Sequence, residues 1–192
     1  MTEFRSLPED VVDEIVKQIG LGLENLRPIP TLGGASELKL FETVDIWSLR
    51  SDLLLESTND LTILAKPTGR WHHQIKINGV PTSYARSVAN GPSALDWHVV
   101  GVFESPIATK IDDAINWIDG NISGDYVVRL LTVPCYQIQA FWLVNNDNSQ
   151  PQQIVLISAP AEYSTLDYER AYAVDEFLDV LRTVNNIQGL CY

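Results

Sequence analysis

The sequence predicts an α+β fold: an antiparallel β-sheet of about five to seven strands, with N-terminal, central and C-terminal helices packed mainly on one face. One observation behind this prediction is a series of short apolar or alternating segments joined by short turns, a pattern that favours antiparallel pairing. The other is that helical periodicity occurs singly, near the start, the middle and the end of the chain. We expect a single globular domain over residues 1–192, in which residues 1–34 could form an N-terminal helical arm.

The first expected element is a helix that begins at a capping box. Residues 6–9 read SLPE, with the S-x-x-E spacing and a proline in the first turn, where a helix tolerates it. Apolar residues then recur at steps of three and four along one face: Val12, Ile15, Ile19, Leu23 and Leu26. The prolines and glycines of residues 27–34 predict the end of this element.

The next stretch contains strands and one ambiguous segment. Residues 37–44 alternate as a half-buried strand does, and residues 45–56 fit either a strand or a short helix that begins at Asp45. The apolar run at residues 60–67 predicts a short strand that ends at Pro67.

A hairpin is predicted next. Residues 71–77 and 80–88 are two extended runs separated by Asn78-Gly79, the dipeptide that tolerates the positive φ angles of a tight hairpin turn. Pro81 cannot donate a ladder hydrogen bond, which places the start of the second strand at a sheet edge.

The second half of the chain predicts strands around one helix, and then a closing helix. The central helix begins at Ser105-Pro106 and runs to about residue 119, with isoleucines along one face. The expected strands cover residues 97–104, 126–133, 136–144 and 153–159. The closing helix is expected within residues 162–184, capped by Ser164 or Thr165.

Composition limits the classes of function. The formal net charge is −12, from 13 Lys and Arg against 25 Asp and Glu, so a nucleic-acid backbone and an anionic membrane surface would both be repelled. We therefore expect neither nucleic acid nor membrane as a partner. The N-terminus has no secretory pattern and no window is apolar enough to span a bilayer, which predicts a cytoplasmic protein.

The cysteines and the known motifs predict no bound group. Cys135, expected inside a strand, and Cys191 lie far apart and in no metal-type spacing, so both are predicted to be reduced thiols. No glycine-rich nucleotide-binding motif and no metal-ligand spacing is present. We accordingly expect no cofactor, no metal and no nucleophile motif.

The strongest functional signal is electrostatic. Residues 61–95 contain no Asp or Glu, whereas the rest of the chain is strongly acidic. If the strands of this segment are adjacent, their cations form a patch that would attract a carboxylate, a phosphate or an acidic partner segment. The predicted anion-binding residues are Arg70, His72, His73, Lys76, Arg86 and His98. The alternative is that these cations pair with the chain's own acids, such as Asp112 or Asp113.

The histidines and one strand offer further hypotheses. Successive strand residues point to opposite faces, so one of His72 and His73 should face a packed layer and the other solvent. If their strand neighbours that of His98, one of them shares its side. In residues 136–144 one face mixes glutamines with Phe141 and Leu143, which, if exposed, would form a partner surface.

Two classes of function follow from these observations. The first is a protein-interaction or ligand-binding module, expected to be a homodimer, that uses the basic segment 61–95 and binds an unidentified protein or a small anionic ligand. The alternative is a small enzyme in which His98 and either His72 or His73 act as acid–base groups in a pocket between sheet and helices. We favour the module, because no polar constellation has the spacing that catalysis commonly needs, and we assign no catalytic residue.

Overall fold

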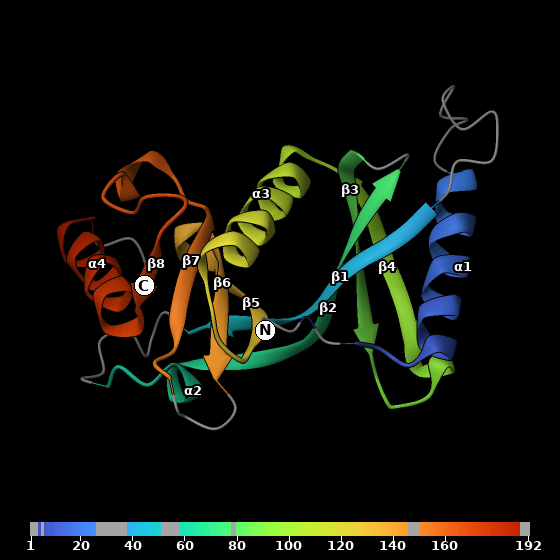
Figure 1. Cartoon of the computed structure of the whole chain (residues 1–192), viewed down its shortest axis with the longest axis horizontal. Helices are drawn as coiled ribbons and strands as arrows, with labels where there is room; N and C mark the ends of the chain where they lie inside the picture. The colour runs from blue at the N-terminus through green and yellow to red at the C-terminus, as the bar shows by residue number, and fades with distance from the viewer. Residues whose placement is uncertain are drawn as a thin grey trace. The chain divides into compact units, whose positions relative to one another are not determined.

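The computed structural model describes residues 4, 6–25, 38–50, 58–77, 80–145 and 150–188. Within them the chain has an α+β fold, shown in Figure 1. The helices are α1 (Glu9–Asn25), α2 (Leu61–Leu64), α3 (Pro106–Asn121) and α4 (Val174–Gln188). The strands are β1 (Leu38–Leu49), β2 (Ala65–Ile77), β3 (Val80–Ala89), β4 (Trp97–Glu104), β5 (Tyr126–Val133), β6 (Ile138–Asn145), β7 (Gln153–Ser158) and β8 (Ala171–Ala173). No helix among the described residues is both long and apolar enough to cross a membrane.

The sheet is mixed and has eight strands in the order β4-β3-β2-β1-β5-β6-β7-β8. The α+β class is therefore confirmed, but the expected all-antiparallel sheet of five to seven strands is not. The exception is β1, which runs parallel to β5 and places Ile46 opposite Leu130. A parallel pair needs a long crossover, and here the connection includes β2, β3, β4 and helix α3. Sequence alternation cannot show which distant strand becomes a neighbour.

The chain clusters into two compact units, which we name by their position along the chain. The N-terminal unit lies within Phe4–Asp45 and Gly69–Asp112, and the C-terminal unit within Ile46–Thr68 and Asp113–Tyr192. Strands β1 and β2 and helix α3 each contribute residues to both units. The single domain expected over residues 1–192 stays a prediction.

The C-terminal unit buries both faces of its strands. On one face, side chains of β6 and β7 join α2 and α4 in a single apolar cluster, which includes Trp142, Leu156 and Phe177. On the other face, Phe141 and Leu143 are 1% and 0% exposed. That helices pack mainly on one face stays a prediction.

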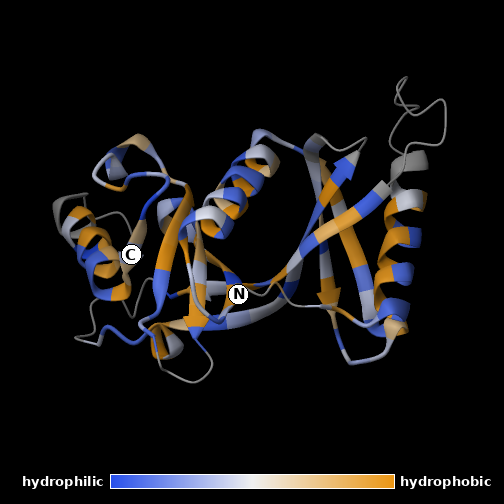
Figure 2. Cartoon of the chain, viewed as in Figure 1, coloured by the Kyte–Doolittle hydropathy of each residue, from blue (hydrophilic) through white to orange (hydrophobic). Residues whose placement is uncertain are grey.

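The N-terminal unit has its own apolar cluster beneath α1. Val11, Ile15 and Ile19 of the helix pack against Ile75 of β2 and Trp97 of β4. Figure 2 shows hydrophobic and hydrophilic residues interleaved along α1, as an amphipathic helix requires. The helix predicted after the SLPE sequence is thus present.

Helix α1 also satisfies the backbone of β4, which stands at one end of the strand order. The Gln18 side chain donates from Nε2 to the Trp97 carbonyl at 2.9 Å. Its Oε1 accepts from the Val99 N–H at 2.7 Å. One amide therefore replaces part of the missing neighbouring strand, because it offers a donor and an acceptor to the same edge.

Several local expectations around β2 and β3 are corrected by the structure. The sequence left strand and helix open for residues 45–56, and the structure places residues 45–49 in strand β1. The strand expected at residues 60–67 begins instead with α2, because the Asp60 side chain caps that turn by accepting from the Thr62 N–H at 2.8 Å. Strand β3 as a whole lies between β2 and β4, but its pairing with β4 begins at Ser83, so the start of β3, which contains Pro81, lies outside that pairing.

Two expectations in the second half are also wrong. Cys135 lies exposed in a 3₁₀ turn between β5 and β6, not inside a strand. The closing helix begins only at Val174, since the residues before it form another 3₁₀ turn and the short strand β8, which pairs with β7. Three parts of the sequence prediction lie outside the described residues: the Asn78-Gly79 turn, residues 51–57 and Cys191.

Candidate functional site

The register of β2, β3 and β4 places four of the predicted binding residues on one face. His72 stands opposite Arg86, and Arg70 opposite Val88, in the antiparallel pair β2–β3. Val88 in turn stands opposite His98 of β4. Because directly opposite residues share a face, Arg70, His72, Arg86 and His98 all lie on the same side. Strand β3 lies between β2 and β4, so the condition of that hypothesis, neighbouring strands for His72 and His98, is not met, although the two residues share a face.

The same face carries an aromatic stack. Tyr84 of β3 stands opposite Gln74 of β2 and Phe103 of β4. The rings of His72 and Tyr84 stack at 5.0 Å between centroids, and those of Tyr84 and Phe103 at 5.1 Å. We call the surface formed by Arg70, His72, Tyr84, Arg86, His98 and Phe103 the basic face.

His73 points to the opposite face and has a structural role there. It is 0% exposed, and both of its ring nitrogens are hydrogen-bonded. Nδ1 and the Thr43 hydroxyl of β1 lie 3.0 Å apart, and Nε2 and the Ser87 hydroxyl of β3 lie 2.7 Å apart. Burial, with a further contribution from the charge of Arg86, lowers the pKa of His73 to about 4. The neutral imidazole therefore links three strands and does not join the basic face.

His72 is also buried, which contradicts the expectation that one of the paired histidines faces solvent. It is 1% exposed, and its Nε2 donates to Gln74 Oε1 at 3.3 Å. Gln74 in turn donates to the Ala108 carbonyl of α3 at 2.7 Å. Burial and then the neighbouring charge of Arg86 hold the pKa of His72 well below its usual range. Within the described residues its Nδ1 has no hydrogen-bond partner, so it is left as a bare acceptor.

Arg86 is the cation at the centre of the basic face. Its guanidinium lies 5.2 Å from the centroid of the Tyr84 ring. Burial lowers the pKa of Arg86, the charge of Arg70 lowers it further, and the interactions with Tyr84 oppose these effects. Within the part of the chain that the structure describes, Arg86 forms no ion pair with a carboxylate. Among the described residues, no carboxylate therefore neutralises its positive charge.

Lys76 behaves differently from Arg86. Its Nζ lies 2.8 Å from Asp112 Oδ1 and 4.4 Å from the centroid of the Phe41 ring. The alternative left open by the sequence, that a cation of this segment pairs with the chain's own acids, thus holds for Lys76. It leaves this lysine with little free charge to offer a ligand.

Phe103 and Gly101 are residues of this face that the sequence reasoning missed. Gly101 stands opposite Arg86, and a Cβ at this position would lie 2.6 Å from Cζ of Phe103. The edge of the Phe103 ring therefore rests on the bare backbone of Gly101. A glycine inside a predicted strand was the available signal, because it marks a close approach by another group.

The remaining predicted surface does not form. Phe141 and Leu143 are buried within the C-terminal unit, so the expectation that they are exposed to a partner is wrong. Among the described residues, no group of three or more His, Cys, Asp or Glu side chains could hold a metal ion.

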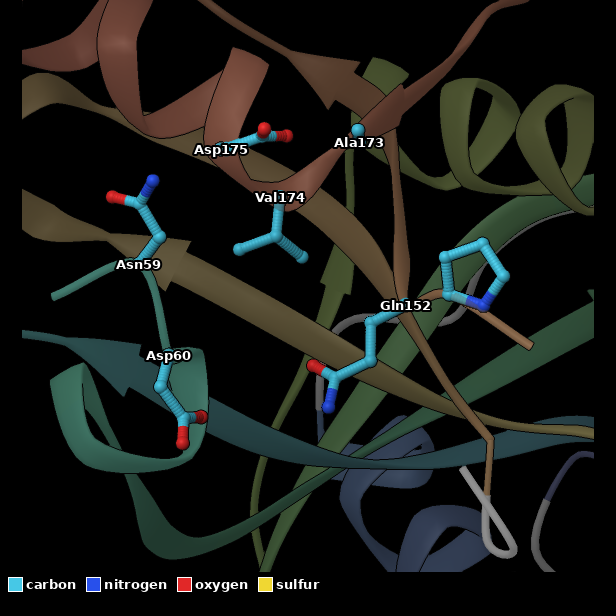
Figure 3. Close-up of a pocket in the computed structure, with 7 residues that line it drawn as sticks. Asn59, Asp60, Gln152, Ala173, Val174 and Asp175 are labelled. Carbon is cyan, nitrogen blue, oxygen red and sulfur yellow. The ribbon is translucent and has the colours of Figure 1, made fainter. Parts of the chain in front are cut away.

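A pocket of about 380 Å³ in the C-terminal unit is a second candidate, drawn in Figure 3. Its polar side chains already serve the fold. Asp60 caps α2, Asn59 Oδ1 accepts from Arg182 at 2.7 Å, and Gln152 Oε1 accepts from the Trp142 indole at 2.9 Å. In Figure 3 the carboxylates of Asp60 and Asp175 do not point toward one another. We therefore place the candidate site on the basic face.

That assignment depends on the geometry of this chain alone. The two arginines, the neutral His72 and the aromatic stack are brought together by strand register, not by a motif. No protein-family model, no curated protein and no solved structure matches this chain.

Proposed function

We propose that the N-terminal unit is a binding module for a small anionic ligand, which it holds on the basic face. The observation that carries this proposal is the half-buried guanidinium of Arg86, next to Arg70 and without a carboxylate partner among the described residues. A half-buried cation loses part of its hydration, and burial weakens the screening of its charge by water. A bound anion would offset this cost.

The chemistry of the face favours a compact anion with planar oxygens. Guanidinium groups offer paired N–H donors that match a carboxylate or a phosphate. His98 is exposed on the same face, and His72 is neutral, so it adds no charge. The net charge of −12 opposes an extended polyanion, whereas a small anion encounters mainly the local positive field.

The test is a calorimetric titration of the full chain with inorganic phosphate and with citrate. We expect binding by the wild-type protein and a loss of at least tenfold in affinity for Arg86→Met, which keeps the apolar stem over Tyr84 but removes the charge. The matched control is Lys76→Met, which removes a cation from β2 that Asp112 already neutralises, and which should leave the affinity unchanged. Equal affinities in wild type and Arg86→Met, or no binding of either anion, would refute the proposal.

The enzyme alternative gains no specific support. His73 lies on the face opposite His98, and the ring of His72 is hydrogen-bonded to Gln74 and stacked on Tyr84. The interaction module, the homodimer and the cytoplasmic location stay predictions.

A further inference from the structure

The basic face ends in an exposed aromatic ring whose position is fixed. Phe103 is 43% exposed, and its inner side stacks on Tyr84, which stacks on the buried ring of His72. Gly101 provides the flat backbone on which the ring edge rests. A ring that is already ordered loses little conformational entropy when a ligand stacks on it.

This ring and the central cation lie in adjacent rows of one face. Arg86 stands opposite Gly101, and Phe103 follows two residues later on the same strand. Phe103 and Gly101 are roughly 7 Å apart along β4, because they are same-face residues of one strand. Gly101 stands directly opposite Arg86 of β3, so one small molecule can contact the ring and the guanidinium together. The spacing suits a flat ring joined through a short linker to an anionic group.

We propose that the ligand of the basic face is an aromatic anion of the nucleoside monophosphate class. Its phosphate contacts Arg86, and its base stacks on Phe103. This inference rests on the proposed function and adds the ring to it. Arginine suits phosphate because its planar guanidinium donates two hydrogen bonds to the same group. Any of the nucleic-acid bases can stack on a phenylalanine ring.

The experiment compares three probes by calorimetry on the full chain: adenosine monophosphate, inorganic phosphate and adenosine. For the wild-type protein we expect the nucleotide to bind about tenfold more tightly than phosphate, as one base–aromatic stack provides. In Phe103→Leu the nucleotide affinity should fall to that of phosphate, with phosphate binding itself unchanged. Phe103→Tyr keeps the ring and should keep the wild-type preference.

Two further variants separate stacking from general loss of apolar surface. Phe41→Leu removes another exposed phenylalanine of the N-terminal unit, 42% exposed, and should leave nucleotide binding unchanged. Gly101→Ala should displace the Phe103 ring and lower the nucleotide preference without affecting phosphate. Thermal melts of every variant confirm that each is folded before it is titrated.

The outcomes distinguish the two proposals. If phosphate binds and the nucleotide binds no more tightly, the aromatic ligand is refuted and the anion module stands. If Phe103→Leu still prefers the nucleotide to phosphate, this inference is also refuted, because the base would then contact a residue other than Phe103. If neither phosphate nor nucleotide binds, both proposals fail. If a single-stranded oligonucleotide binds more tightly than the mononucleotide, the mononucleotide proposal is refuted and the ligand is a polymer.

Discussion

Strand β6 of the C-terminal unit and strand β3 of the N-terminal unit are covered differently. In the C-terminal unit, both faces of β6 are sealed, and Phe141 and Trp142, adjacent in sequence and on opposite faces, are 1% and 0% exposed. In the N-terminal unit, β3 buries Ala85 against the apolar cluster under α1, while Arg86 and Tyr84 point to the other side. Arg86 is half-buried on that second side, whereas Phe141 and Trp142 are buried on both faces of β6. We therefore place the candidate site on β3 and its neighbours in the N-terminal unit.

The same contrast exists between two consecutive residues. His73 has a partner for each ring nitrogen and serves the packed face. His72 keeps a bare Nδ1 and lies beneath the aromatic stack of the basic face. His73 thus has a structural role, whereas His72 lies on the face of the candidate site. The two differ because successive strand residues point to opposite faces of the sheet.

The largest expected effect tests the sealed face of the C-terminal unit. Phe141→Ala should lower the free energy of unfolding by about 3–5 kcal/mol, because it removes a buried ring and leaves a cavity. Phe103→Ala on the basic face should cost under about 1 kcal/mol, since that ring is 43% exposed. Urea denaturation measures both, and similar losses for the two variants would break the comparison.

The next effect is the pH dependence that His73 imposes. Folding lowers the pKa of His73 from 6.5 to about 4. Between these two pH values the imidazole is protonated in the unfolded chain and neutral in the folded chain. Stability is therefore full above pH 6.5 and falls as the pH drops toward 4, by about 3 kcal/mol from this residue. His72, with its pKa lowered in the same direction, adds to the loss. Chemical denaturation at pH 7 and pH 4.5 should show a smaller difference in His73→Gln than in wild type; an equal difference would assign the loss to other groups.

A smaller effect concerns the edge strand of the N-terminal unit. Gln18→Ala removes the amide that satisfies the Trp97 carbonyl and the Val99 N–H, and should cost about 1–2 kcal/mol. Gln18→Glu keeps the acceptor for Val99 but loses the donor, so an intermediate loss is expected. Thermal melts of both variants check this order, which a fully tolerated Gln18→Ala would contradict.

The smallest effect sharpens the distinction between the cations. Lys76→Met should change the free energy of unfolding by less than about 1 kcal/mol, because a partly exposed ion pair contributes little. A double-mutant cycle with Asp112→Asn isolates the pair. A coupling of several kcal/mol would show that Lys76 is a central structural cation rather than a suitable binding control.

Local periodicity determined a substantial part of this protein. The capping box and apolar spacing of residues 6–25 predict α1, and two extended runs separated by Asn78-Gly79 predict the β2–β3 pair. The period of two in a strand places His72 and His73 on opposite faces. The absence of acids from residues 61–95 identifies the basic segment. Each of these signals depends only on residues near one another in the chain.

Only the tertiary structure decided which distant elements meet. Three contacts join segments whose proximity no local pattern predicts: the parallel β1–β5 pair, the Lys76–Asp112 ion pair and the stacking of Phe103 on Tyr84. Packing also decided that Phe141 and Leu143 are buried, although the strand expected over residues 136–144 placed them on the same face as two glutamines. The physical reason is that periodicity sets the face to which a side chain points, whereas burial and neutralisation depend on what packs against that face.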